Sequence, residues 1–302
     1  MIWLSWRQQR TETLIALGIL GLLALVLIPT GINMASAFHH DGLLDCSAPC
    51  MPQAEAFTGR FAQMGNLIAW LTLIPGVIGI LLAAPFINQL EAGTYRLDWT
   101  QSITHGRWIT GKLGLAVGTA LLAALVLTVL VTWWRAPFVH LQGRVNNSIY
   151  DSEGTVVFAY TLFALGLAAA LGAVWRRAVP ALIAAFSAYF AVRLFVDTWL
   201  RQRLVTPVTT TWNVHARAPD LNHAWIMSQY TTTGSGRKIP FITCPHGSGG
   251  ACEPRLKSGF VHAVYQPAGH FWALQVRETA LFGLVALLLL GFAAWWTYRR
   301  SG

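Results

Sequence analysis

Six stretches of this chain are long and apolar enough to cross a membrane, and no other feature limits the possible folds as strongly. A helix needs about 20 mostly apolar residues to cross the roughly 30 Å hydrocarbon core of a bilayer. The stretches are residues 14–34, 64–87, 113–134, 155–175, 178–200 and 279–298. They lack the alternation of membrane barrel strands, and backbone groups inside lipid must be paired. The predicted fold class is therefore an all-α membrane protein with six transmembrane helices.

The N-terminal region predicts a helix that stays in the mature chain. Its apolar stretch is longer than the roughly 7–15 residues of a signal-peptide core. Trp3 and Trp6 lie close to Arg7 and Arg10, a mixture that suits a short helix in the lipid headgroup layer. We expect residues 1–13 to form such an interfacial helix.

Positive charges in the short loops predict the orientation, because Lys and Arg are enriched on the cytoplasmic side. The short loops on the opposite side hold Arg60, Arg135 and Arg144. We expect a multi-pass cell-membrane protein with both termini in the cytoplasm. Much of the net charge of +9 is spread over membrane flanks, and the remainder lies mostly between Arg201 and Arg277. The charge is thus not gathered on one basic face, which argues against nucleic-acid binding. The predicted cytoplasmic side carries Arg7, Arg10, Arg96, Arg107, Lys112, Arg176, Arg177, Arg299 and Arg300.

All four cysteines fall in the predicted outer loops. Cys46 and Cys50 lie in the first of these loops, and Cys244 and Cys252 lie in the last. Thiols placed on an oxidising face predict disulfides, for which three connectivities exist. Proximity in the sequence favours Cys46 with Cys50 and Cys244 with Cys252. Four free thiols remain the alternative.

Residues 201–276 differ from the rest of the chain. They are rich in Thr, Gly, Pro and His, and they alternate like strands around residues 208–214 and 260–264. We expect a small, partly β extracellular domain stapled by its two cysteines. The predicted domains are thus 1–200 with five helices, 201–276 outside the cell, and 277–302 with the sixth helix and a cytoplasmic tail. The histidines of residues 201–276 do not have the spacing of a zinc site, so we expect no bound metal.

The fifth apolar stretch contains two opposite charges, Arg193 and Asp197. Four residues apart on a helix they share a face and can neutralise each other. Ionisable residues inside a membrane helix are functional candidates, although long side chains near a helix end can also reach water. We therefore interpret the pair either as facing the substrate or as a structural ion pair. With Asn66 of the second stretch, the two residues are the candidates for a substrate pathway.

A polar segment, residues 86–112, separates the second and third stretches. It contains Glu91-Ala92-Gly93-Thr94, then a Trp-Thr-Gln-Ser-Ile-Thr run at 99–104, and then Arg107-Trp108. This segment resembles the coupling helix of ABC exporter permeases. The likeness is to the type-two exporter superfamily with the type V fold, and in particular to actinobacterial permeases whose ATPase is a separate chain. Residues 265–275 resemble the outer amphipathic helix before the last membrane helix of those permeases.

The resemblance implies a non-catalytic subunit that works with other chains. The implied partners are two copies of an ABC ATPase, a second permease copy (identical or related) and membrane lipid. ATP and Mg²⁺ would be bound by the ATPase, and this chain would bind no cofactor. The resemblance assigns ATPase coupling to Glu91, Gly93, Thr94, Arg96, Asp98, Gln101 and Arg107.

ATP binding by this chain itself is not expected. Residues 106–112 match the first seven positions of a P-loop, but Leu113 follows where Ser or Thr would hold Mg²⁺, and a membrane span begins there. Motifs of membrane-embedded enzymes such as His-Glu-x-x-His are also lacking. We expect an exporter of an amphipathic or hydrophobic substrate. The alternative is a membrane sensor, receptor or immunity subunit with an extracellular ligand-binding module.

Overall fold

The computed structural model describes residues 2–45, 51–93, 104–145, 150–216, 219, 221, 223–240 and 259–301. The four cysteines lie outside these residues, and so do their predicted disulfides. The described chain is mostly helical, and six of its helices are long and apolar enough to cross a membrane. That prediction is confirmed. The apolar helical segments are Arg10–His40, Ile74–Ala92, His105–Gln142, Val156–Trp175, Ala178–Leu204 and Ala268–Arg300.

The helices begin and end at well-defined residues, and most extend beyond the predicted spans. The helices are α1 (Ile2–His40), η1 (Leu43–Asp45), α2 (Met51–Arg60), α3 (Ala62–Leu71), α4 (Ile74–Ala92), α6 (His105–Gln142), α8 (Val156–Trp175), α9 (Ala178–Phe195), the π-helical η3 (Val196–Leu200), α10 (Arg201–Leu204), η4 (Ala268–His270) and α11 (Phe271–Ser301).

The boundaries of the second predicted span were wrong. The stretch 64–87 is divided into α3 and α4, and the apolar helix is Ile74–Ala92. Pro75 occupies the first turn of α4. Proline lacks an N–H and its ring excludes a preceding helical turn, so a helix starts there easily but does not run through. Pro85, in contrast, is accommodated inside α4.

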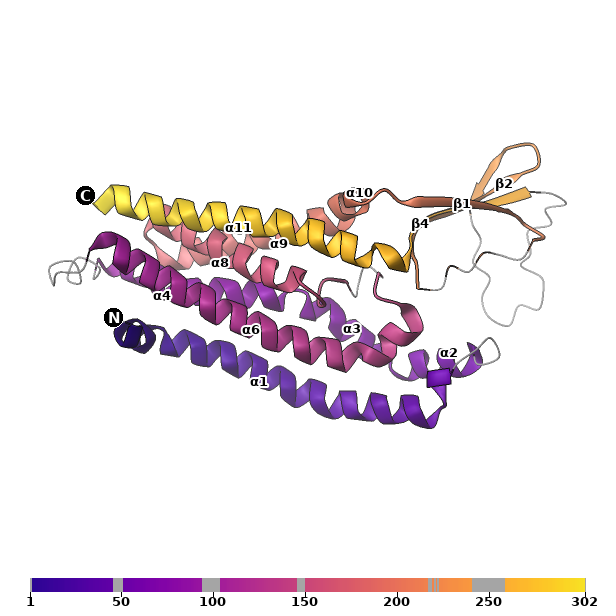
Figure 1. The fold of residues 1–302 in the computed structure, drawn as a ribbon, viewed down its shortest axis with the longest axis horizontal. Helices are drawn as coiled ribbons and strands as arrows, with labels where there is room; N and C mark the ends of the chain where they lie inside the picture. Colours follow the sequence, from indigo (N-terminus) through magenta and orange to yellow (C-terminus); the bar gives the residue numbers. More distant parts are fainter. Residues whose placement is uncertain are drawn as a thin grey trace.

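Two helices that the sequence predicts, one at the N-terminus and one before the last membrane helix, are not separate elements in the structure. Residues 2–13 are not a separate helix, because α1 is continuous from Ile2 to His40. Its first turns are seen nearly end-on in Figure 1, at an angle to the rest of the helix. Residues 265–275 do not form a separate amphipathic helix either. They comprise the end of a strand, η4 and the start of α11.

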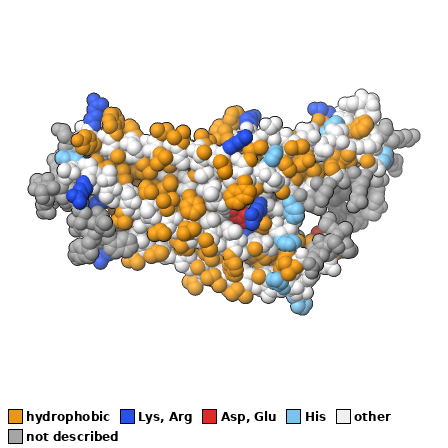
Figure 2. All heavy atoms as spheres, in the orientation of Figure 1, with side chains coloured by type: hydrophobic (Ala, Val, Ile, Leu, Met, Phe, Trp, Pro, Cys, Tyr) orange, Lys and Arg blue, Asp and Glu red, His pale blue; other side chains and the backbone are white. Residues whose placement is uncertain are grey.

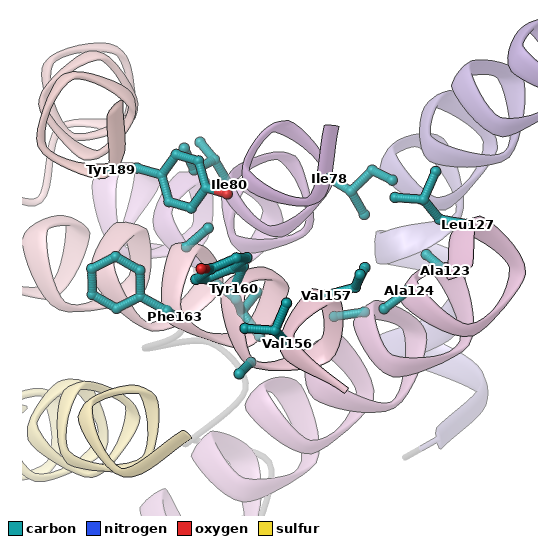
Figure 3. Packing of buried hydrophobic residues seen from close by; sticks show 14 of the residues in the cluster. Ile78, Ile80, Ala123, Ala124, Leu127, Val156, Val157, Tyr160, Phe163 and Tyr189 are labelled. Atoms are coloured by element: carbon teal, nitrogen blue, oxygen red, sulfur yellow. The ribbon is translucent and has the colours of Figure 1, made fainter. Parts of the chain in front are cut away.

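Helix α8 lies at the centre of the bundle, where glycines allow close packing. A Cβ on Gly79 of α4 would overlap the backbone carbonyl of Thr161, and one on Gly172 of α8 would overlap Ile87. Small residues of this kind let membrane helices approach closely. Figure 3 shows the buried side chains around this contact, among them Ile78 and Val157. The contact fixes α4 against α8.

The outer surface of the bundle is apolar. Residues such as Leu22 and Leu25 of α1 and Leu287 and Leu288 of α11 are exposed. Figure 2 shows hydrophobic side chains over the length of the bundle, with several Lys and Arg side chains at the end where the termini lie. An exposed apolar surface of this extent suits contact with lipid.

Residues 208–266 contain a four-stranded antiparallel sheet, so the chain is not purely α. The order is β1-β4-β2-β3, with a bulge in β2 between Ile226 and Ser228. Its alternating Thr, Val and aromatic residues are typical of strands, as the sequence had indicated. The strands are β1 (Val208–Asn213), β2 (Trp225–Thr233), β3 (Lys238–Pro240) and β4 (Gly259–Gln266).

The bundle has two distinct ends (Figure 1). One end carries both termini together with the end of α4 and the start of α6, the two helices that the predicted coupling segment joins. The other end carries the sheet and α2. The termini and these two helix ends therefore lie on the opposite side of the bundle from the sheet.

Candidate functional site

A cluster of five acidic and basic side chains lies at the sheet end of the bundle, and four of the five are buried. Three of them lie on one continuous helical segment, with Arg193 on α9, Asp197 on η3 and Arg201 on α10. The other two are Asp151, in the turn before α8, and Glu278 on α11. Residues 193, 197 and 201 are spaced by four, which places them on one face of the segment. That face points toward α8 and α11.

Asp151 joins the two arginines. Its Oδ2 lies 2.5 Å from Nη2 of Arg193, and its other oxygen pairs with Arg201. Asp197 also contacts both, with its Oδ1 2.8 Å from Arg201 and 3.5 Å from Arg193. The two arginines are therefore held by shared carboxylates rather than in separate pairs.

Glu278 completes the cluster from α11. Nε and Nη2 of Arg201 donate to Oε2 and Oε1 of Glu278, each at 3.2 Å. Such two-pronged pairing of guanidinium and carboxylate is strong and directional. The hydroxyl of Tyr160 on α8 also donates to Glu278. The cluster therefore connects the α9–α10 segment to both α8 and α11.

Tyrosine rings cover the arginines. The guanidinium of Arg193 lies 4.0 Å from the ring centre of Tyr160, and that of Arg201 lies 4.5 Å from that of Tyr150. These contacts are cation–π interactions. Burial, and then the negative charge of Glu278, raise the pKa of Tyr150 well above its ordinary value. The Tyr150 hydroxyl therefore stays protonated.

Burial makes the pairing essential. Arg201 and Glu278 are fully buried, whereas the side chain of Asp197 is 30% exposed. An ion taken out of water loses several kcal/mol of hydration, which is recovered only through good pairing and hydrogen bonds. Asp197 is the one member of the cluster that reaches the surface.

Gln275 holds the turn that carries Asp151. Its Oε1 accepts a hydrogen bond from the backbone N of Val156 at 3.1 Å, and its Nε2 donates to the carbonyl of Glu153 at 3.1 Å. Gly154 adopts φ +72° directly against the Gln275 amide, where a Cβ would clash. The turn before α8 is thus tied to α11, and this fixes Asp151 beside the arginines.

A second ionic contact lies in the same turn. Glu153 lies 3.7 Å from the buried Arg135 and 4.0 Å from Arg144, both of the preceding α6 region. Burial raises the pKa of Glu153, and the two arginines oppose that rise. The turn is therefore bound to α6 as well as to α11.

At the opposite end of the bundle, Glu91 links two helices. Its Oε2 accepts a hydrogen bond from the backbone N of Ala178 at 2.8 Å. Ala178 is the first residue of α9, whose N-cap Arg177 makes no side-chain cap. A carboxylate at a helix N-terminus satisfies a free N–H and complements the helix dipole. Gly93, with φ 67°, ends α4 two residues later.

The structure describes some of the site residues that were predicted from the sequence, and others lie outside the described residues. Arg193 and Asp197 do contact each other, but as part of the larger cluster. Glu91, Gly93 and Arg107 are described, and Arg107 lies exposed in the first turn of α6. The structure does not describe the side chain of Asn66, which lies in α3. Outside the described residues lie Thr94, Arg96, Asp98 and Gln101.

The sequence reasoning missed three members of the cluster, Asp151, Arg201 and Glu278. Arg201 was assigned to the extracellular domain, and Asp151 and Glu278 were not considered, because each of the three lies just outside a predicted span. The helical segments actually extend to Leu204 and begin before Glu278. Longer spans would have identified Arg201 and Glu278 as charges inside membrane helices, which are candidates by default.

Comparisons with known proteins agree with this architecture. The family model described as "ABC-2 membrane transporter related" matches residues 17–201, more than half of the chain. The matched region begins in α1 and ends at Arg201 of the cluster. No curated protein and no solved structure matches the chain. The chain therefore belongs to the ABC-2 membrane transporter related family, as a multi-pass membrane permease of the ABC-2 type.

Proposed function

We propose that this chain is the membrane-spanning subunit of an ATP-driven exporter that moves an amphipathic or hydrophobic substrate across the cytoplasmic membrane. ATP and Mg²⁺ are bound and ATP is hydrolysed by a separate ABC ATPase, of which two copies dock at the end of the bundle that carries the termini. A second permease copy completes the pathway. The sheet then lies outside the cell. The observation that carries the proposal is the hydrogen bond between Glu91 and Ala178.

That hydrogen bond connects the coupling segment, residues 86–112, to α9. Glu91 lies in the last turn of α4, two residues before Gly93. Ala178 is the first residue of α9, a helix of 18 residues. Such a helix is about 27 Å long and rigid along its axis. A push on the segment is therefore transmitted to the far end of α9.

The far end of α9 leads directly into the ionic cluster. Because Arg193 and Arg201 both lie on the α9–α10 segment, any axial shift of α9 changes their pairing with Asp151 and Glu278. A buried ion network has few arrangements that satisfy every charge, so it favours discrete states. Nucleotide binding on the ATPase would bias the choice between them. In this proposal the cluster is the outer gate of the transport pathway.

The first experiment identifies the partner and tests the coupling. The tagged chain is purified from native membranes and its partners are identified by mass spectrometry, which should show an ABC ATPase. In the reconstituted complex, vanadate-trapped nucleotide should change the distance between genetically encoded labels at Leu194 and Val276, two exposed positions beside the cluster. Absence of an ATPase would contradict the proposed function.

Variants of Glu91 then test the route. Glu91→Gln keeps an oxygen acceptor for the Ala178 N–H, whereas Glu91→Ala removes it. We expect ATP hydrolysis in both, a label distance that still changes in the Gln variant, and a loss of that change in the Ala variant. A normal distance change in Glu91→Ala would exclude Glu91 as the link without excluding the exporter.

A second candidate function is a sensor, receptor or immunity subunit. The sheet favours it, because β1, β2 and β4 form an ordered surface at one end of the bundle. Under this alternative the purified chain retains no ATPase, and a ligand of the sheet stabilises the protein. The same co-purification experiment therefore separates the two functions.

A further inference from the structure

A cleft at the end of the bundle that carries the termini is not used by the proposed function. It has a volume of about 470 Å³, and its described lining consists of Trp296, Arg299 and Arg300, in the last turns of α11. Arg300 Nη1 donates to the carbonyl of Val174 at 3.2 Å, which places the end of α8 beside it. The end of α8 thus lies next to a residue that lines the cleft.

The cleft presents donors to its occupant. The guanidinium of Arg299 lies 5.5 Å from the ring of Trp295, and that of Arg300 lies 6.0 Å from the ring of Trp296. Both arginines are exposed. The indole Nε1 of Trp296 is buried and finds no hydrogen-bond acceptor among the described residues. A buried donor without an acceptor is unfavourable, so an acceptor on a bound molecule would stabilise this group.

The surroundings indicate the membrane–water boundary. Trp175, Trp295 and Tyr298 are exposed at this end, and exposed Leu287 and Leu288 continue the surface of α11 toward the middle of the bundle. Trp and Tyr prefer the depth of the lipid headgroups. A lipid seated here would place its phosphate at the arginines and its acyl chains along the apolar helix. An acidic protein surface would satisfy the charges but not that apolar continuation.

We propose that the cleft binds the headgroup phosphate of an anionic phospholipid, with Arg299, Arg300 and the Trp296 indole N–H as its donors. Basic pockets between membrane helices are a recurrent way of holding anionic lipid headgroups. Arginine suits this role because its planar fork of donors matches phosphate oxygens. The proposal does not depend on the exporter function.

The test is a lipid competition. The full chain, with any subunit that co-purifies, is delipidated in detergent and mixed with equal amounts of phosphatidylglycerol and phosphatidylcholine that carry identical acyl chains. Native mass spectrometry then measures the ratio of the bound lipids. We expect phosphatidylglycerol to be retained preferentially. Arg299→Gln/Arg300→Gln should lower the ratio by about fivefold for each arginine, while Arg299→Lys/Arg300→Lys should keep most of it.

Two further variants sharpen the test. Trp296→Phe keeps the ring and removes the donor, so it should also lower the preference. Arg203→Gln is the matched control, because Arg203 lies 4.0 Å from the ring of Trp199 and donates to its carbonyl, but lies on α10 at the other end of the bundle. It should leave the ratio unchanged. Thermal melting of each variant shows whether it is folded.

Four results would overturn the proposal. The first is equal retention of both lipids by the parent chain. The second is an Arg203→Gln effect as large as that of the double Gln variant. The third is displacement of phosphatidylglycerol by a tenfold excess of inorganic phosphate, which would indicate a site for a soluble anion. The fourth is a double Gln variant that loses a co-purified subunit but keeps its lipid preference, which would indicate a protein-docking surface.

Discussion

Arg201 on α10 and Glu278 on α11 form a two-pronged pair inside the bundle, with both donor–acceptor distances at 3.2 Å. Neither side chain reaches the surface. Because each charge has exchanged water for the other, the pair is a point where two helical segments are held together and where separation is costly. This property makes the cluster suitable as a gate, and it also makes its contribution to stability measurable.

Removing one partner of this pair should destabilise the chain strongly. Glu278→Gln removes a negative charge that pairs with the buried Arg201 guanidinium. Loss of one partner of a buried pair typically costs about 3–5 kcal/mol. Unfolding in detergent, followed by circular dichroism, measures the change. Asp197→Asn is the comparison, and we expect a smaller effect because that side chain is 30% exposed.

A double substitution should recover much of the loss. Arg201→Met/Glu278→Leu removes both charges and replaces them with apolar side chains, which is often neutral or stabilising for a buried pair. We expect the double variant to be more stable than Glu278→Gln, while the nucleotide-driven distance change beside the cluster is lost. A double variant as unstable as the single one would show that the cluster depends on geometry rather than on charge balance.

The hydrogen bond from Ala178 to Glu91 predicts a contrast between two substitutions. Loss of an N-terminal cap costs about 0.5–2 kcal/mol, so Glu91→Ala should lower stability by that order. Glu91→Gln should lower it less, because the amide oxygen still accepts the bond. Denaturant unfolding of the two variants gives the difference. If both variants were as stable as the parent chain, the bond would have no structural weight.

Gly79 should not tolerate a side chain. A Cβ at this position would overlap the carbonyl of Thr161, so Gly79→Ala must push α4 away from α8. Overpacking of this kind costs about 1–3 kcal/mol. The control is Gly118→Ala on α6, where no atom lies within 4 Å of the added Cβ. That change should be neutral or stabilising by up to about 1 kcal/mol. Thermal unfolding of both variants tests the packing.

The proposed topology predicts which end of the bundle faces outward. An epitope inserted at the exposed turn between Gly234 and Ser235 should be detected on intact cells. An epitope after the C-terminal α11 should be detected only after permeabilisation. Staining of both cell preparations checks the prediction, and the reverse pattern would place the proposed ATPase end on the wrong side of the membrane.

Much of the architecture could be predicted because it is encoded locally. An apolar run of sufficient length must become a helix in lipid whatever its neighbours are. The Thr- and Val-rich alternation indicated the strands of the sheet, because this pattern is also local in the sequence. Span ends were less predictable, because a helix can extend into the interface with polar residues. This is why Arg201 was assigned to the extracellular domain and Glu278 was left just outside the sixth span.

Three features could be inferred from the sequence alone: the six apolar helices, the strand-forming region, and the likeness of residues 86–112 to a coupling segment. The contacts of Glu278 with Arg201, 77 residues away, and of Glu91 with Ala178, 87 residues away, became apparent only in the folded chain. The physical reason is that hydrophobicity acts on each segment independently. The pairing of buried charges depends instead on which helix faces pack together, and that follows from side-chain fit between segments distant in the chain, such as Gly79 against Thr161.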